Sequence, residues 1–249
     1  GAPSREQIRN WILESASSDA RMTGGAITGS TATGLEDSYS DIDLAFGVIE
    51  GVDRGQIFSD FAALVTSKID VLHHFDLTSG SATFRLFLLQ GGLELDVGLY
   101  PGSGFGAKGD AFKLVFGQEV RLEEGAQPQD QLIGLCWHHA LHADAAVARG
   151  RGWQAEFYIS ALRDHAMELA CARLGLPAIY ARGIDKLPTE MLATFEPALV
   201  QSLDTAELRR ALTVASRQYL HELRFIDVAL SEQLADIFKT RERLGRTKS

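Results

Sequence analysis

Residues 29–48 read GSTATGLEDSYSDIDLAFGV, and this stretch decides the fold. Its second half places Asp41-Ile42-Asp43 at the start of an apolar run, the pattern of a buried β-strand. Side chains alternate along a strand, so Asp41 and Asp43 share one face and their apolar neighbours enter the core. Those core-facing neighbours are Ile42, Leu44 and Phe46. Two carboxylates on one strand face suit a hard cation such as Mg²⁺.

The first half of this stretch predicts a phosphate-binding turn. Residues 26–28 read as a short strand that ends at Gly29, and Ser30 opens a short helix over residues 30–33. The free N–H groups and the dipole of a helix N-terminus favour phosphate, so Gly29 and Ser30 are candidate nucleotide-binding residues. Taken singly, a Gly-Ser turn or an Asp-x-Asp pair has an ordinary explanation in turn and cap chemistry. Their ordered combination favours a metal–nucleotide site.

This run resembles the signature of the nucleotidyltransferase superfamily, which includes DNA polymerase beta and the antibiotic nucleotidyltransferases. The superfamily pattern adds a third carboxylate on a later, neighbouring strand. Residues 93–100, LELDVGLY, alternate between apolar and polar, which puts Glu94 and Asp96 on one face. Asp96 is the best match, and by resemblance it either completes the metal site or is the base that takes a proton from the acceptor. The alternative is that both acids are solvated residues of an edge strand.

The resemblance implies a specific use of these acids. Nucleotidyl transfer is an in-line displacement at the α-phosphorus, and two Mg²⁺ ions about 3.5–4 Å apart can stabilise both the entering and the leaving oxygen. The implied metal ligands are Asp41, Asp43 and Asp96, and the implied substrate is a nucleoside triphosphate such as ATP.

The composition and charge of the chain limit the classes of binding partner that we expect. The chain has 249 residues and a net charge of −9, and 45% of its residues are hydrophobic. No Lys/Arg cluster occurs outside residues 239–248, which argues against nucleic acid as a partner, because phosphate neutralisation supplies most of the affinity for a nucleic acid. An acidic cleft would attract a polycationic small molecule such as an aminoglycoside.

Other features predict a soluble intracellular protein. No run approaches the roughly twenty apolar residues of a membrane span, so we expect no membrane partner and a cytoplasmic location. Cys136 and Cys171 fall in apolar, helix-like stretches and are expected to be buried, reduced thiols. The sequence leaves the oligomeric state open, with a homodimer as one option.

The N-terminal half predicts a small mixed sheet backed by helices. The expected helices cover residues 4–19, with Ser4 as N-cap and Ile8, Trp11, Ile12 and Ser15 inward, and residues 56–69. Strands are expected at 70–76, 82–90 and 92–100, the last two joined by a glycine turn at 90–92. Residues 102–106, GSGFG, read as a flexible connection. On the strand at 70–76, alternation sends one of His73 and His74 inward and the other outward.

From about residue 127 the pattern is helical only. Helices are expected at 128–149, 153–174, 188–196 and 204–231, with a further piece to 243. We therefore predict an α+β fold: a nucleotidyltransferase domain over residues 1–125 and an all-α, acceptor-binding bundle over 126–249. This order resembles the kanamycin, streptomycin/spectinomycin and lincosamide nucleotidyltransferases.

The same resemblance suggests site residues in the bundle. Kanamycin nucleotidyltransferase takes its general-base glutamate from a helix of its C-terminal domain, which makes Glu156 a candidate base and Arg163 a candidate triphosphate contact. Glu156, Ser160 and Arg163 fall on one helix face by their spacing. A solvated, salt-bridged face is the alternative. Lys186, in a polar loop at residues 180–186, is a further candidate nucleotide contact.

Histidine spacing gives a weaker signal. His138 and His142 stand four residues apart on one predicted helix, which is geometry that zinc can use. The glutamate of a His-Glu-x-x-His motif is absent between them. We therefore interpret these residues as packed or cleft-lining histidines.

The sequence thus supports transfer of AMP or another NMP to a hydroxyl of a small molecule, for example an aminoglycoside or a lincosamide. Two alternatives remain at this stage: the same chemistry on a protein or an uncharacterised metabolite, and a non-catalytic, antitoxin-like role. Sequence alone says little about the acceptor, because function belongs to the site and not to the fold.

Overall fold

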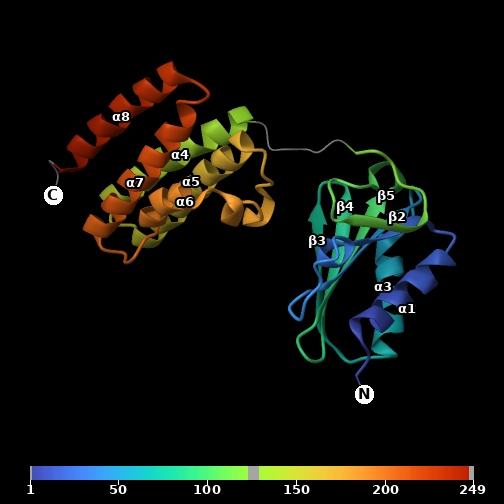
Figure 1. Ribbon diagram of the computed structural model, residues 1–249. Helices are drawn as coiled ribbons and strands as arrows, with labels where there is room; N and C mark the ends of the chain where they lie inside the picture. Colours follow the sequence, from blue (N-terminus) through green and yellow to red (C-terminus); the bar gives the residue numbers. More distant parts are fainter. Residues whose placement is uncertain (1, 123–128, 247–249) are drawn as a thin grey trace. The chain divides into compact units, whose positions relative to one another are not determined.

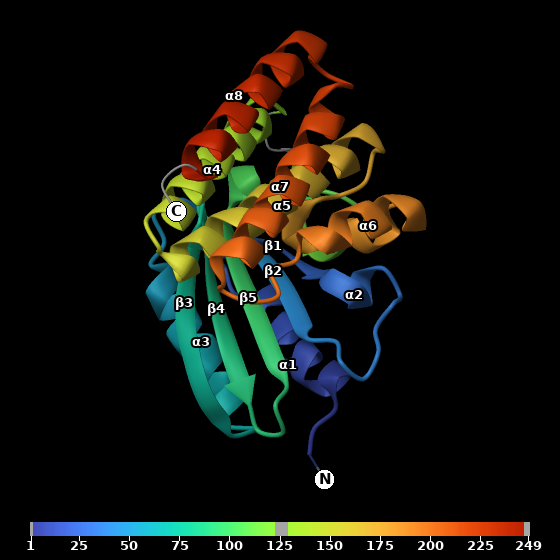
Figure 2. The same ribbon diagram turned by 90° about the vertical axis from the view of Figure 1, so that its left-hand side faces the viewer.

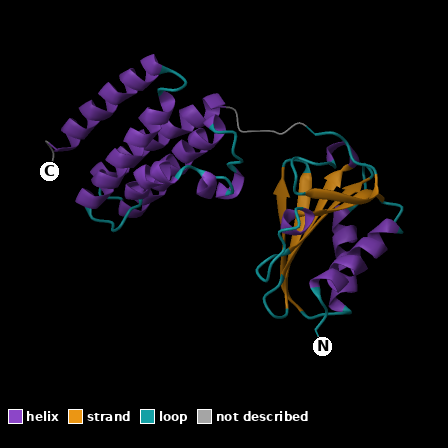
Figure 3. Cartoon of the chain, in the orientation of Figure 1, coloured by secondary structure: helices purple, strands orange, loops and turns teal. Residues whose placement is uncertain are grey.

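The computed structural model describes residues 2–122 and 129–246. The chain divides into two compact units, residues 1–125 and 126–249 (Figure 1). The first unit holds a mixed β-sheet with helices, and in the second the described residues form helices and turns (Figure 3). The predicted α+β class is confirmed.

The first unit is built on a six-stranded sheet in the order β3-β4-β5-β2-β1-β6. Only β2 and β5 pair in parallel, and the other neighbours are antiparallel. The strands are β1 (Met22–Thr28), β2 (Ile42–Val48), β3 (Val71–Ser79), β4 (Ala82–Leu89), β5 (Glu94–Pro101) and β6 (Phe112–Gly117). A four-residue helix, α2 (Gly29–Ala32), follows β1 directly.

Two helices, α1 (Arg5–Ser17) and α3 (Arg54–Thr66), cover one face of this sheet (Figure 2). Helix α1 begins with the predicted Ser4 cap, a capping box in which Gln7 N–H donates to Ser4 Oγ at 3.2 Å. Ile8 and Ile12 are fully buried as expected. Ser15 is exposed, so its inward placement was wrong; Leu13 and Ala16 take that side of the helix.

Residues 102–106 are not a loose connection. A 3₁₀ turn, η1 (Gly102–Gly104), is followed by Phe105, which is 1% exposed and packs against Phe112 with ring centroids 5.5 Å apart. The aromatic side chain anchors the segment on the sheet face opposite α1 and α3. The chain after this segment continues into β6. The sequence analysis missed this strand because the stretch before β6 is rich in glycine.

The edge strand β3 departs from strict alternation. His73 and His74 are both exposed, which contradicts the expectation that one of them points inward. Strand β3 lies at the edge of the sheet, and every residue of it from Leu72 to Ser79 is exposed.

The second unit is a helical bundle. Its helices are α4 (Gln129–Ala148), α5 (Gly152–Arg173), α6 (Thr189–Phe195), α7 (Thr205–Leu223) and α8 (Val228–Arg246). Three 3₁₀ turns connect them: η2 (Ile179–Ala181), η3 (Ile184–Lys186) and η4 (Glu196–Ala198). No helix in the described residues is long and apolar enough to cross a membrane.

The long helix expected at 204–231 is two helices. The chain turns after Leu223, whose carbonyl accepts from the Ile226 and Asp227 N–H groups at 2.9 and 2.8 Å. Asp227 then accepts from the Leu230 N–H at 2.9 Å, a capping bond that starts α8. Helical periodicity on both sides of the turn hid this break in the sequence.

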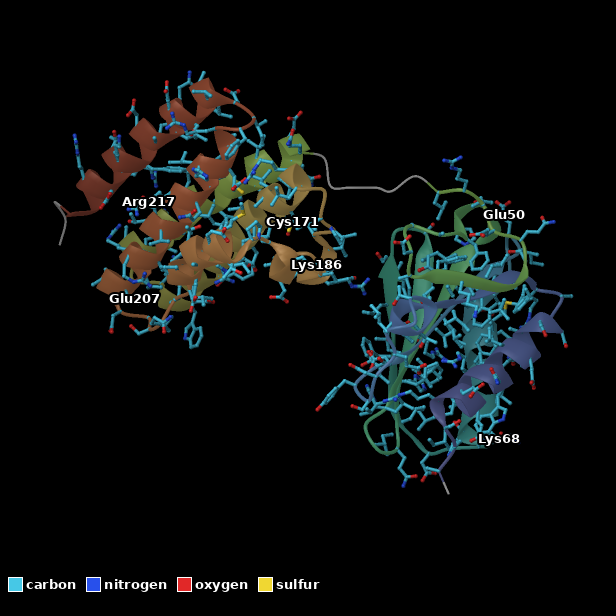
Figure 4. All side chains as sticks on the ribbon, viewed as in Figure 1. Glu50, Lys68, Cys171, Lys186, Glu207 and Arg217 are labelled. Carbon is cyan, nitrogen blue, oxygen red and sulfur yellow. The ribbon has the colours of Figure 1, made fainter. Side chains whose placement is uncertain are left out.

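The bundle core contains two polar anchors. Tyr219 is fully buried and donates its hydroxyl to the Ile133 carbonyl at 3.1 Å. Glu222, with a side chain 2% exposed, receives two hydrogen bonds from Arg173 at 2.8 and 3.0 Å. Cys136 and Cys171 are free and buried, as predicted. Figure 4 labels Cys171.

Candidate active site

The parallel pairing of β2 with β5 brings two of the candidate acids together. Asp43 lies directly opposite Asp96 in the register, and neighbouring strands are about 4.8 Å apart. The residues that flank them in sequence are buried against α1 and α3, so both aspartates project from the opposite face. The flanking residues are Ile42, Leu44, Leu95 and Val97. Sequence alternation therefore predicted this shared face correctly.

Asp96 lies in a strongly acidic setting. Its Oδ1 is buried and has no hydrogen-bond partner among the described residues. Burial, and to a smaller extent the nearby charges of Asp43, Glu94 and Asp41, together raise the pKa of Asp96 to about 7. Every charge that shifts this pKa is another carboxylate, so a cation at this point would relieve both the repulsion and the unpaired oxygen.

Gly29 is required where β1 meets α2. Its φ is +66°, in the left-handed region, and a Cβ at this position would overlap the carboxylate of Asp43. The backbone of the turn and the Asp43 carboxylate therefore lie in direct contact. A side chain at Gly29 would displace the acid or the turn.

Ser30 has a different environment from the one expected. Its hydroxyl donates to Ser40 Oγ at 2.9 Å, and Ser40 in turn donates to Asp37 Oδ1 at 3.1 Å. These bonds tie α2 to the loop that leads into β2. The Ser30 hydroxyl is therefore engaged with the loop that precedes β2.

Helix α1 holds the same loop from the other side. Arg5 donates to the Asp37 and Ser38 carbonyls at 3.0 and 2.6 Å, and Arg9 lies 3.7 Å from Glu36. The sequence analysis missed this role of Arg5, because no local pattern links a helix to a loop more than 30 residues away. The loop before Asp41 is thus positioned by side chains outside the motif.

The acids fit a divalent cation by their chemistry. Within the described ranges no three His, Cys, Asp or Glu side chains converge into a formed metal-ion site. Asp43 and Asp96 are adjacent, and Asp41 is exposed one residue before β2. Carboxylate oxygens are the ligands that Mg²⁺ prefers. Oδ1 of Asp96, which has no hydrogen-bond partner among the described residues, is available to coordinate such an ion.

The remaining candidates belong to the helical unit. Glu156 on α5 is half-buried and accepts a hydrogen bond from Ser160 Oγ at 2.6 Å. Arg163 donates to the adjacent Asp164 at 2.7 and 2.9 Å instead of joining that pair. Lys186 is exposed at the end of η3 (Figure 4).

The histidines of α4 contact one another, and one of them stacks on His165 of α5. His138 and His142 have ring centroids 4.2 Å apart, and His139 stacks on His165 at 5.2 Å. Burial lowers the pKa of His139, and the three neighbouring histidines lower it further. This environment favours a neutral, packed ring at His139.

Two comparisons with known proteins find nothing: no protein-family model matches the chain, and neither does any curated protein. Solved structures do show similarity. An aminoglycoside 6-adenyltransferase from Bacillus subtilis aligns over 96% of this chain and 99% of its own, with a TM-score of 0.40 and 11% identity. The polymerase core of TRAMP, an RNA surveillance complex, aligns over 88% of this chain and 59% of its own, with a TM-score of 0.27 and 15% identity. Similarity at this level assigns no role to individual residues.

Proposed function

We propose that this chain is a magnesium-dependent nucleotidyltransferase that moves AMP, or another NMP, from a nucleoside triphosphate to a hydroxyl of a small molecule. The observation that carries the proposal is the in-register pair Asp43 and Asp96, with Gly29 against one acid and a partnerless buried oxygen on the other. An acid cluster of this kind is costly to bury unless a cation joins it.

In this proposal each residue has a definite task. Asp41, Asp43 and Asp96 hold Mg²⁺, and the Gly29 turn lets the triphosphate approach the backbone N–H groups of α2. Bound magnesium supplies charge neutralisation at the phosphates. The acceptor oxygen forms a bond to the α-phosphorus, the bond to the bridging oxygen breaks, and pyrophosphate leaves.

The hydroxyl proton must go to a carboxylate within about 2.6–3.2 Å of it, or one water away. Asp96 is the first candidate, because its raised pKa is near neutral, where a general base works well. Glu156 is the second, by resemblance to kanamycin nucleotidyltransferase. If Asp96 is mainly a metal ligand, Asp96→Asn weakens magnesium-ATP binding as well as turnover, and Glu156→Gln lowers turnover alone. If Asp96 is the base, Glu156→Gln is nearly silent.

Arg163 and Lys186 are proposed triphosphate contacts. Arg163 is now engaged with Asp164, so a phosphate would have to compete with that carboxylate. Lys186 is exposed and can reach a ligand at little cost. Replacement of either with Gln is expected to raise the KM for ATP more than it lowers kcat.

The experiment that tests the function is incubation of the full chain with ATP labelled at the α-phosphate, Mg²⁺, and a panel of aminoglycosides and lincosamides. Transfer of label to one acceptor, with release of pyrophosphate, supports the proposal. Asp43→Asn should lower transfer by about a thousandfold. Asp70→Asn, at an exposed position of the same unit, should leave it unchanged. Magnesium-ATP binding with no transfer to any acceptor would favour a different acceptor class, and no binding at all would end the proposal.

A further inference from the structure

The helical unit contains a cavity of about 320 Å³ between α4, α7 and α8. Its interior is mostly apolar, formed by Leu141, Leu212, Leu220 and Phe238. Alanines at positions 140 and 235 leave the space that longer side chains would fill. The volume lies at the lower end of the range of small-molecule sites, about 300–1,000 Å³.

The rim of this cavity is cationic, although the whole chain is acidic. Four basic side chains and two carboxylates line it, which leaves two positive charges in excess. The carboxylates are Asp144 and Glu242, and the basic residues are Arg209, Arg217, Lys239 and Arg241. This balance contrasts with the net charge of −9 for the chain. The cavity is therefore suited to an anion and not to a polycation.

The basic residues divide into two kinds. Arg209 and Arg241 both bind Asp144, at 3.3 and 2.9 Å, and so are fixed in place. Among the described residues Arg217 and Lys239 have no hydrogen-bond or ion-pair partner. Arg217 projects from α7 (Figure 4) and lines the cavity together with Lys239 of α8. Both side chains are exposed, so two solvated cationic groups without a protein partner border one apolar space.

We propose that this cavity binds a small anionic amphiphile: a molecule with an aliphatic or aromatic body and one carboxylate or phosphate head. The body would replace water against Leu212, Leu220 and Phe238, which is favourable in proportion to the apolar area buried. The head would pair with Arg217, whose planar guanidinium can donate two parallel hydrogen bonds to such a group. Charge and shape point to the same ligand class.

This site is independent of the proposed transfer reaction. A polycationic aminoglycoside would meet the excess positive charge of the rim, so the cavity does not fit that acceptor. A bound amphiphile would also contact α4, α7 and α8 together and hold α8 to the bundle. Binding should therefore raise the Tm of the protein, and above the Kd the increase should grow with the logarithm of ligand concentration.

The test uses the full chain and calorimetric titration with decanoate, decyl phosphate and the neutral isostere decanamide, each kept below its aggregation concentration. We expect saturable binding of decanoate or decyl phosphate, and the stronger of the two identifies the head. Decanamide should bind at least about tenfold more weakly. Equal binding of decanamide, or no saturable binding of either anion up to about 1 mM, would overturn the proposal.

Matched variants locate the site. Arg217→Gln should weaken binding about tenfold or more, and Arg224→Gln, an exposed arginine at the end of the same helix and outside the cavity, should leave it unchanged. Ala235→Leu should fill the cavity and block binding in a variant whose circular dichroism matches the parent. If Arg217→Gln and Arg224→Gln bind the anion equally well, the assignment is wrong whatever Ala235→Leu does.

Discussion

The two units of this chain treat buried carboxylates in opposite ways. In the helical unit Glu222 receives two hydrogen bonds from Arg173, and Asp144 receives bonds from two arginines. In the sheet unit one oxygen of Asp96 has no hydrogen-bond partner among the residues that the structure describes, and the charges that shift its pKa are all acidic. Because an unpaired buried charge costs several kcal/mol, the second arrangement persists only where something else offsets it.

This difference separates structural acids from candidate functional acids. The paired acids stabilise the bundle, and their loss should lower its stability. The crowded acids on β2 and β5 destabilise the apo protein, and their loss should remove activity while the fold survives. The following predictions test that separation, from the largest expected effect to the smallest.

The largest effect is expected at the acid pair. Asp43→Asn should lower nucleotidyl transfer by about a thousandfold, the equivalent of about 4 kcal/mol in the transition state, because one magnesium ligand is lost. The melting temperature should stay within a few degrees of the parent. Initial rates with α-labelled ATP measure the first quantity, and Asp70→Asn is the control. A variant with Asn at both 41 and 43 that transfers at the normal rate would refute the metal site.

Glu222→Gln should have the reverse effect. The change leaves the Arg173 guanidinium without its counterion, so we expect a loss of about 3 kcal/mol in the free energy of unfolding. Magnesium-ATP binding per folded molecule should not change. Urea denaturation followed by circular dichroism gives the stability. If Glu222→Gln proves neutral while Asp96→Asn unfolds the protein, the separation of roles is reversed.

The sequence predicted the acid-bearing strands of the sheet unit better than the strand pairing and the chain breaks elsewhere. Alternation over 41–46 and 93–100 placed the acids on one face, because period-two burial leaves a clear pattern. It could not predict the pairing of Asp43 with Asp96, which depends on strand order, nor the contact of Gly29 with Asp43. Strand β6 and the break before Asp227 were missed, since a short strand after glycines and a turn between two periodic helices leave little local signal.

The pH dependence of stability should reveal the raised pKa of Asp96. Its pKa of about 7 in the folded state exceeds the unfolded value near 4, so the folded protein binds more protons between these values and loses stability as pH rises through that range. Asp96→Asn removes this loss. The variant should be more stable than the parent at pH 8 and nearly equal to it at pH 4.

Asp76 is the control in this experiment, because its pKa is shifted in the opposite direction to that of Asp96. The hydrogen bond from Arg85 lowers the pKa of Asp76, so its stabilisation is present above pH 4 and is lost as the solution becomes more acidic. Asp76→Asn should therefore be less stable than the parent at pH 8. Identical stability–pH curves for Asp96→Asn and the parent would show that Asp96 is not held in an acidic, buried setting.

A smaller effect is expected at the turn. Gly29→Ala and Gly34→Ala both place a side chain at positive φ, +66° and +74°, at a cost of about 1–2 kcal/mol each in stability. Only at Gly29 would the new Cβ also overlap Asp43; at Gly34 it meets open space. Gly29→Ala should thus weaken magnesium-ATP binding, measured by calorimetry, and Gly34→Ala should not. Equal affinities in the two variants would remove the turn from the nucleotide site.

The central claim is that the acid cluster around Asp96 is the magnesium–nucleotide site, and proton release on binding tests it most directly. Magnesium-ATP is titrated at pH 7 into the parent and into Asp96→Asn, in buffers with different enthalpies of ionisation. With a pKa of about 7, roughly half of the Asp96 carboxyls carry a proton before binding and must lose it to hold the ion. The parent should release about half a proton per site, and Asp96→Asn should release none and bind weakly. Equal affinity and equal proton release in the two proteins would contradict the account.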